Sequence, residues 1–208
     1  MANITALFWD VGGVLGTNGW DRYARADAVT RFGLDGTEFE RRHQDVVNEF
    51  ETGRLTLDDY LALVVFNAPR QFHPGDFKDF MFGRSQPYDE ALALARSIAG
   101  EGSVLMAVLS NESREINDYR VERFGMRNVF SAFFSSCYVG LRKPDAVIYR
   151  LALDVTQQAP AQCLMIDDRQ ENLETAATLD MQTLLHDGSV EVLRQKLELL
   201  GVSIGPKK

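Results

Sequence analysis

The most informative segment of this chain is Ile4-Thr5-Ala6-Leu7-Phe8-Trp9-Asp10-Val11-Gly12-Gly13-Val14-Leu15. A short apolar run that ends at a carboxylate and two glycines is typical of a buried β-strand that leads into a tight loop. In an open α/β sheet, ligands bind beyond the carboxyl ends of the strands, so Asp10 is a candidate nucleophile or metal ligand. Taken alone, the segment also fits an aspartate that only caps a turn.

Composition limits the classes of partner. The 208 residues include 22 Lys and Arg against 30 Asp and Glu, and the net charge is −8. Without a basic run, this balance argues against nucleic acid and anionic membranes and favours a small-molecule partner. Cys137 and Cys163 lack metal-site spacing, and we find no leader or membrane-spanning stretch, so we expect a soluble, cytoplasmic protein. The sequence does not indicate the oligomeric state.

Four further apolar segments have the length and composition of strands, at 104–109, 132–137, 163–166 and 182–185. Helical periodicity follows most of them, and strands that alternate with helices form a parallel sheet. The predicted fold class is therefore α/β, with a Rossmann-like parallel sheet.

Residues 20–82 contain no good strand and separate the first strand from the second. They predict four helices, at 21–32, 38–50, 57–66 and 76–82, with breaks that contain Gly or Pro. The predicted division is a core domain of residues 1–16 and 86–208, and a helical domain of residues 17–85 that is inserted after the first strand.

Polar residues also follow the second and the fourth strands. Ser110-Asn111 precedes a helix, where such residues are commonly just an N-cap, although a helix start also binds anions. Asp167-Asp168 follows segment 163–166. Adjacent carboxylates repel each other unless a cation lies beside them, and hard oxygen ligands suit Mg²⁺. Solvated loop acids are the alternative.

Lys143 lies in a loop before a helix, with Pro144 expected in the first helical turn. A cation beside the positive end of a helix is disfavoured by roughly 0.3–1 kcal/mol, so we expect an anionic neighbour to hold Lys143. A solvated surface lysine is the alternative.

Four of these segments, in this order, resemble the signatures of the haloacid dehalogenase-like (HAD) phosphohydrolase superfamily. They are Phe8–Leu15, Leu109–Asn111, Arg142–Asp145 and Ile166–Asn172. The resemblance covers nearly the whole chain and is most similar to the branch of sugar-1-phosphate phosphatases and the N-terminal phosphatase domain of soluble epoxide hydrolases. It implies that the inserted helices are a cap domain and that the partner is a small phosphorylated metabolite.

The resemblance implies that Asp10 attacks phosphorus and forms an aspartyl-phosphate, with Mg²⁺ as the cofactor. Asp10, the backbone carbonyl of Gly12 and Asp168 would bind the metal directly, and Asp167 would act through water.

The resemblance also assigns the phosphate-binding residues. Ser110 and Lys143 would bind the phosphoryl oxygens, with Asn111 beside them. Asn18 and Trp20, just after the nucleophile loop, are the leading substrate contacts from the cap, although a tryptophan at helical spacing is more often part of a core.

The chain departs from the family at Gly12, where a second aspartate usually stands. That side chain protonates the leaving oxygen and later activates water, which contributes about 10²–10⁴ in rate. Activated leaving groups suffer less from its loss, so a sugar 1-phosphate or another activated monoester is the expected substrate.

Two rival functions stay open. One is a metal-independent haloacid dehalogenase, which also lacks the second aspartate but does not need both Asp167 and Asp168. The other is a weakly active HAD-like binding or regulatory protein, because Gly12 has removed the acid/base.

Overall fold

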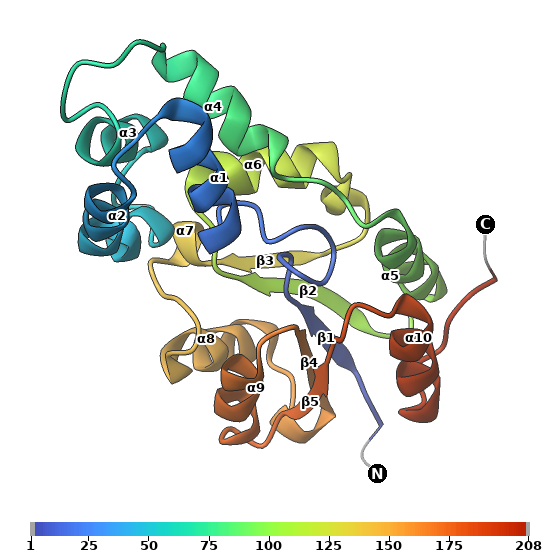
Figure 1. Ribbon diagram of the computed structural model, residues 1–208. Helices are drawn as coiled ribbons and strands as arrows, with labels where there is room; N and C mark the ends of the chain where they lie inside the picture. Colours follow the sequence, from blue (N-terminus) through green and yellow to red (C-terminus); the bar gives the residue numbers. More distant parts are fainter. Residues whose placement is uncertain (1–2, 207–208) are drawn as a thin grey trace.

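The computed structural model describes residues 3–206, with a five-stranded sheet of strand order β3-β2-β1-β4-β5. All neighbouring pairs in it are parallel. The strands are β1 (Ala6–Trp9), β2 (Leu105–Ser110), β3 (Ala132–Ser135), β4 (Cys163–Asp167) and β5 (Gln182–Leu185). The predicted α/β class is confirmed, and Figure 1 shows the sheet in the middle of the molecule with helices on both sides.

Successive side chains of a strand point to opposite faces, so the apolar run of β1 supplies both faces of the sheet. Leu7 and Trp9 belong to one core cluster, Ala6 and Phe8 belong to the other, and all four are fully buried. The first cluster is covered by α5 (Asp89–Glu101), α6 (Arg114–Arg123) and α10 (Val190–Leu199), and the second by α8 (Ala146–Thr156) and α9 (Gln170–Ala177). The core is therefore a three-layer Rossmann-like sandwich.

Between β1 and β2 the chain forms the helices α1 (Arg22–Phe32), α2 (Gly36–Glu51), α3 (Leu57–Val64) and α4 (Pro74–Gly83). Their ends lie within about two residues of the predicted ends, which is the usual uncertainty of helix boundaries. These helices share a hydrophobic cluster that is rich in aromatic rings. Figure 1 shows them above the edge of the sheet where the strands end, and we call residues 17–85 the helical insert.

Two local predictions were wrong. The third strand ends at Ser135, two residues early, because the chain turns there into the short helix α7 (Ser136–Val139). Pro144 lies outside α8, because the carboxylate of Asp145 caps the start of that helix. The 3-10 turns η1 (Met126–Asn128) and η2 (Pro160–Gln162) complete the elements.

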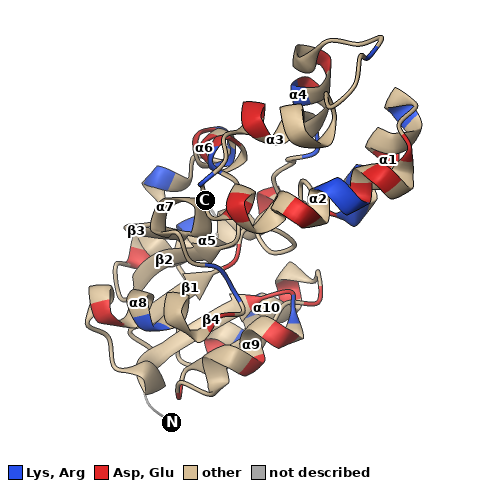
Figure 2. Ribbon diagram, turned by 90° about the vertical axis from the view of Figure 1, so that its left-hand side faces the viewer, with Lys and Arg blue, Asp and Glu red and all other residues tan. Residues whose placement is uncertain are grey.

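Charged residues of both signs are interspersed along the helices. In the view of Figure 2, α1 and α2 carry basic and acidic segments side by side, and within α2 both Arg41 and Arg42 pair with Glu38. Among the helices of residues 3–206, none has the length and apolar composition that crossing a bilayer requires.

Candidate active site

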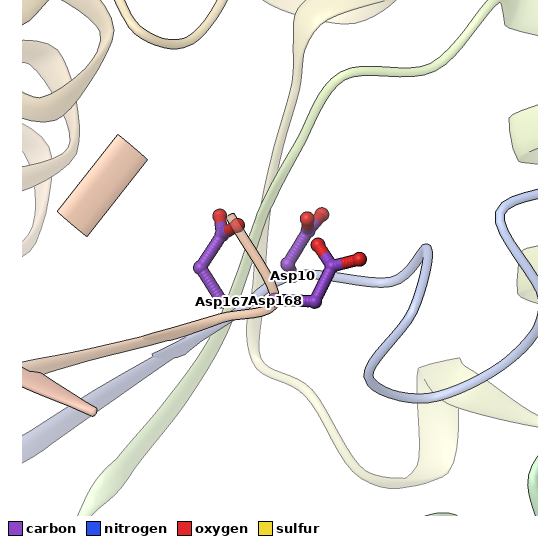
Figure 3. Close-up of side chains that lie close together, drawn as sticks. All are labelled: Asp10, Asp167 and Asp168. Atoms are coloured by element: carbon purple, nitrogen blue, oxygen red, sulfur yellow. The ribbon is translucent and has the colours of Figure 1, made fainter. Parts of the chain in front are cut away.

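The candidate site is built at the ends of three neighbouring strands. Asp10 follows β1, Ser110 ends β2 and Asp167 ends β4. Because β1 lies between β2 and β4 and all are parallel, their carboxyl ends bring these residues together. Asp10, Asp167 and Asp168 each offer an oxygen within 4.8 Å of the others, and Figure 3 shows the three carboxylates on the same side of the strand ends.

Lys143 supplies positive charge to these carboxylates. Its Nζ lies 3.0 Å from Oδ2 of Asp10 and 2.6 Å from Oδ2 of Asp167. Burial opposes the charged form of the ammonium, but the two carboxylates outweigh burial and raise the pKa of Lys143. The anionic neighbour that its sequence position predicts is therefore present.

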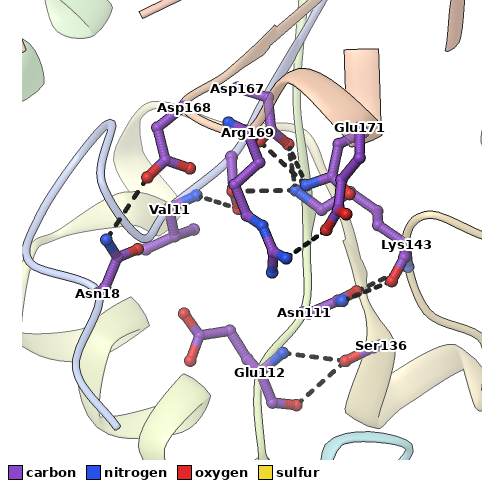
Figure 4. A network of polar contacts seen from close by, with 12 residues as sticks. Val11, Asn18, Asn111, Glu112, Ser136, Lys143, Asp167, Asp168, Arg169 and Glu171 are labelled. Atoms are coloured by element: carbon purple, nitrogen blue, oxygen red, sulfur yellow. Dashed lines mark hydrogen bonds and ion pairs between the residues drawn. The ribbon is translucent and has the colours of Figure 1, made fainter. Parts of the chain in front are cut away.

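Asn111 holds the loop that carries Lys143. Its Nδ2 donates to the carbonyl of Lys143 at 2.8 Å, and its Oδ1 accepts the backbone N–H of Lys143 at 2.8 Å. Figure 4 shows this two-way contact. The amide of Asn111 thus ties the end of β2 to the loop before α8.

Asp167 is fully buried and surrounded by donors. Besides Lys143, it accepts the backbone N–H of Arg169 at 2.9 Å and the Nδ2 of Asn172 at 3.0 and 3.1 Å. These contacts satisfy its oxygens and fix its position. Asp167 therefore anchors the ammonium of Lys143.

The other two carboxylates are less well balanced. Burial raises the pKa of Asp10 to about 7, with Lys143 opposing the rise and Asp167 adding to it. Burial also raises the pKa of Asp168, and Asp167 raises it further. Three carboxylates face the single ammonium of Lys143, so a divalent cation is the ligand that would balance the cluster.

Two buried atoms of the cluster have no hydrogen-bond partner in the described part of the chain, Oγ of Ser110 and Oδ1 of Asp168. The Ser110 hydroxyl lies near enough to Asp10 to lower its pKa, yet it forms no hydrogen bond of normal geometry. Buried polar groups are nearly always satisfied, so these two atoms are available to bind a ligand. The hydroxyl suits an oxyanion, and the carboxylate oxygen suits a cation.

The turn after Asp10 depends on its glycines. Gly13 has a φ of +72°, and a Cβ there would overlap the carboxylate of Asp168. A Cβ at Gly12 would lie 2.7 Å from Oδ1 of Asn18. The absence of side chains in this turn therefore leaves room for Asp168 and Asn18 beside Asp10.

A small cavity of about 50 Å³ lies between the core and the helical insert. Asn18, Trp20 and Asn111 belong to its wall. Asn18 also reaches the carboxylate cluster, since its Nδ2 donates to Oδ2 of Asp168 at 3.4 Å. The indole of Trp20 is anchored inside the insert, where its Nε1 donates to the hydroxyl of Tyr60 at 2.9 Å.

The cavity wall also includes residues that the sequence did not single out, among them His43 and Glu51 of α2 and Glu112 of the core. Glu51 forms an ion pair with Arg142 at 2.7 Å, which joins the insert to the loop before Lys143. Nothing in the sequence marks these side chains, because polar and charged residues in helices and loops are ordinarily solvated.

Both crossings between the core and the insert contact Arg120 of α6. Its Nη2 donates to the carbonyl of Thr17 at 2.8 Å, and its Nε donates to Oγ of Ser85 at 3.0 Å. The same guanidinium pairs with Glu112, and both charged groups are buried. Arg120 therefore fixes the two points at which the chain enters and leaves the insert.

The family model described as haloacid dehalogenase-like hydrolase matches residues 4–180. Bifunctional epoxide hydrolase 2 of Sus scrofa is 24% identical, with 97% of this chain aligned to 40% of that protein. Flavin mononucleotide hydrolase 1 of Arabidopsis thaliana is 27% identical over 88% of this chain and 73% of that protein. The chain spans about 40% of the length of the longer curated relatives that it matches.

Among solved structures, a HAD-family enzyme from Bacteroides thetaiotaomicron in a magnesium complex is similar, with a TM-score of 0.78 and 16% identity. The similarity covers 90% of this chain and 96% of that one, and at this identity it shows the fold. The same protein has also been crystallised with magnesium and inorganic phosphate together. The family match includes all four signature segments, so this chain belongs to the haloacid dehalogenase-like hydrolase family.

Proposed function

We propose that the chain is a Mg²⁺-dependent phosphatase that hydrolyses a small phosphomonoester through an aspartyl-phosphate intermediate. The observation that carries the proposal is the buried cluster in which Lys143 faces an excess of carboxylates, Asp10 and Asp168 among them. The unsatisfied hydroxyl of Ser110 in the same place supports it. Phosphoryl transfer requires mainly in-line positioning and neutralisation of charge, and this cluster is suited to both.

Asp10, Asp168 and the backbone carbonyl of Gly12 would hold Mg²⁺. The unpartnered Oδ1 of Asp168 and its raised pKa fit this role, because a cation would satisfy the atom and favour its ionised form. Asp167 would act through water, since its oxygens already accept protein donors. When bound, Mg²⁺ would neutralise phosphoryl oxygens and favour attack on phosphorus.

The carboxylate of Asp10 would form the new bond to phosphorus while the bond to the leaving oxygen breaks, and that oxygen departs with its electron pair. Lys143, 3.0 Å from Asp10, would keep the nucleophile ionised and neutralise one phosphoryl oxygen. The hydroxyl of Ser110 would donate to another. Water would then attack phosphorus, release phosphate and restore the carboxylate of Asp10.

Among phosphomonoesters we favour activated ones, with a sugar 1-phosphate as the leading candidate. The chain has Gly12 two residues after Asp10, so a carboxyl that could protonate a poor leaving group is missing there. The cavity of about 50 Å³ that Asn18 and Asn111 border is the proposed place for a small leaving group. Flavin mononucleotide, which names one relative, is an alkyl phosphomonoester, so that relative supports phosphomonoester chemistry and not the preference for activated esters.

We propose that residues 17–85 act as a cap domain on a core of residues 1–16 and 86–208. The cap would close over the phosphate, exclude water and select the leaving group. Asn18 and Trp20 are the proposed cap contacts, because both border the cavity. Cys137 and Cys163 are buried and unpaired, which supports a reducing, cytoplasmic location.

Phosphate release from p-nitrophenyl phosphate tests the proposal, with saturating Mg²⁺ and after treatment with EDTA. We expect activity that requires the metal and falls more than about 10³-fold in Asp10→Asn. Asp180→Asn makes the same chemical change at an exposed residue and is expected to keep wild-type activity. A positive result would be followed by a screen of sugar phosphates, nucleotides and acyl phosphates.

The same assay separates the rival functions. Release of halide from a 2-haloacid without metal would identify a dehalogenase. Absence of both activities would favour a HAD-like binding or regulatory protein.

A further inference from the structure

The side chain of Asn18 lies where a side chain on residue 12 would lie. A Cβ at Gly12 would stand 2.7 Å from Oδ1 and 3.7 Å from Cγ of Asn18. The backbone at Gly12 is outside the left-handed region, so a side chain there would need only space. Asn18 is exposed, and its Oδ1 occupies the space that a side chain on residue 12 would enter, so such a side chain would have to displace it.

Asn18 is held in this place from both sides. Its Nδ2 donates to Oδ2 of Asp168 at 3.4 Å, as Figure 4 shows. On its N-terminal side, the carbonyl of Thr17 accepts Nη2 of Arg120 at 2.8 Å. On its C-terminal side, Gly19 has a φ of +66°, and a Cβ there would overlap the same guanidinium. The backbone on each side of Asn18 is therefore packed on Arg120.

We infer that Asn18 stands in place of a proton donor and thereby restricts the enzyme to esters with good leaving groups. The inference rests on the proposed phosphatase function. An amide donates a hydrogen bond but does not transfer a proton at neutral pH. As the bond from phosphorus to the leaving oxygen breaks, that oxygen keeps the electron pair and takes its proton from water. Aryl, acyl and anomeric sugar phosphates tolerate such a departure better than alkyl phosphates do.

The first test introduces a proton donor without changing the shape of the side chain. Asn18→Asp is compared with the wild type on a series of aryl and alkyl phosphates of rising leaving-group pKa, at saturating Mg²⁺. We expect the plot of log kcat/KM against leaving-group pKa to flatten, so that the alkyl-to-aryl ratio rises about tenfold or more. Asn128→Asp adds the same charge at an exposed residue of η1, near the opposite edge of the sheet, and should keep the wild-type slope.

The second test asks whether side chains at residues 12 and 18 compete for the same space. In Gly12→Asp alone, the new side chain must displace Asn18, whereas Gly12→Asp combined with Asn18→Gly removes the obstacle. We expect the double variant to have the higher alkyl-to-aryl ratio, with thermal unfolding used to verify that both variants fold.

The outcomes distinguish the role of Asn18 from the phosphatase function itself. An unchanged slope in Asn18→Asp, or equal ratios in the single and double Gly12 variants, would overturn the role of Asn18 in an active phosphatase. If the wild type released no phosphate in a metal- and Asp10-dependent way, the phosphatase function would be overturned, and this inference with it.

Discussion

The helical insert and the carboxyl edge of the sheet both bury polar groups, but they balance them differently. In the insert, the hydroxyl of Tyr60 lies 2.9 Å from Nδ1 of His43 and accepts the N–H of Trp20 at 2.9 Å, so neutral groups satisfy one another. At the sheet edge, the carboxylate of Asp10 and its acidic neighbours outnumber the ammonium of Lys143. A buried net charge is unfavourable in free energy, so it is found where a bound ligand neutralises it.

The largest effect is expected at the sheet edge, from the variant Lys143→Ala. It removes the ammonium that pairs with Asp10 and Asp167, and Asp167 keeps only its neutral donors from Arg169 and Asn172. We expect the free energy of unfolding at pH 7 to fall by about 3–5 kcal/mol, as when one partner of a buried ion pair is removed. Phosphatase activity should fall by more than about 10³-fold. Urea unfolding and phosphate release measure the two effects.

Lys196→Ala, which removes an exposed lysine from α10, is the matched control and should change stability by less than about 0.5 kcal/mol. Added Mg²⁺ should restore part of the stability of Lys143→Ala, because a second cation can balance the same carboxylates. If Lys143→Ala were as stable as the wild type without metal, the edge would not be short of positive charge, and the contrast with the insert would be lost.

The sheet edge could be predicted from the sequence because strands determine it. Asp10, Ser110 and Asp167 lie at strand ends, and parallel strands bring such ends together whatever the details of the surrounding helices. Lys143 lies in a loop, so the family pattern was needed to place it beside the carboxylates.

The contribution of the insert could not be predicted in the same way. Asn18 was predicted as a contact only because it follows the nucleophile loop, and its orientation was not. Glu51 reaches the cavity through its side-chain rotamer and the angles at which the helices pack, and no local pattern encodes either. Trp20 illustrates the difficulty, since its ring packs on Phe77 with centroids 5.8 Å apart and also borders the cavity. A sequence pattern does not distinguish these two roles.

Lowering the pH should destabilise the insert through His43, which the fold keeps neutral. Burial lowers the pKa of His43 from 6.5 to about 4, with Arg25 lowering it as well. Between these two values the unfolded chain binds a proton that the folded chain does not, so this histidine lowers the free energy of unfolding as pH falls from 6.5 to about 4. Above pH 6.5 it has no such effect. The effect should be intermediate in size, and urea unfolding across this pH range measures it.

His43→Gln isolates this contribution, because glutamine can contact Tyr60 but does not titrate. The comparison is needed because the raised pKa values of Asp10, Asp168 and Glu51 act in the opposite direction as pH falls. We expect His43→Gln to lose less stability than the wild type between pH 6.5 and 4. His73→Gln, at an exposed histidine, should follow the wild type. Parallel curves for all three proteins would mean that His43 is not kept neutral by the fold.

The smallest effect is expected where the two regions meet, at the ion pair between Glu51 and Arg142. Both side chains are about one-third exposed, so Glu51→Gln should lower the free energy of unfolding by no more than about 1 kcal/mol. The pair joins α2 to the loop before Lys143. Its loss should therefore weaken the contact between the insert and the core more than it weakens the internal packing of either one. Hydrogen exchange at the crossings, residues 17–20 and 84–87, should accelerate a few-fold, while the strands keep their protection.

Glu38→Gln breaks ion pairs that lie wholly within α2, and it should leave exchange at the crossings unchanged. Equal acceleration in both variants would mean that the crossings respond to the stability of α2 rather than to the contact between insert and core.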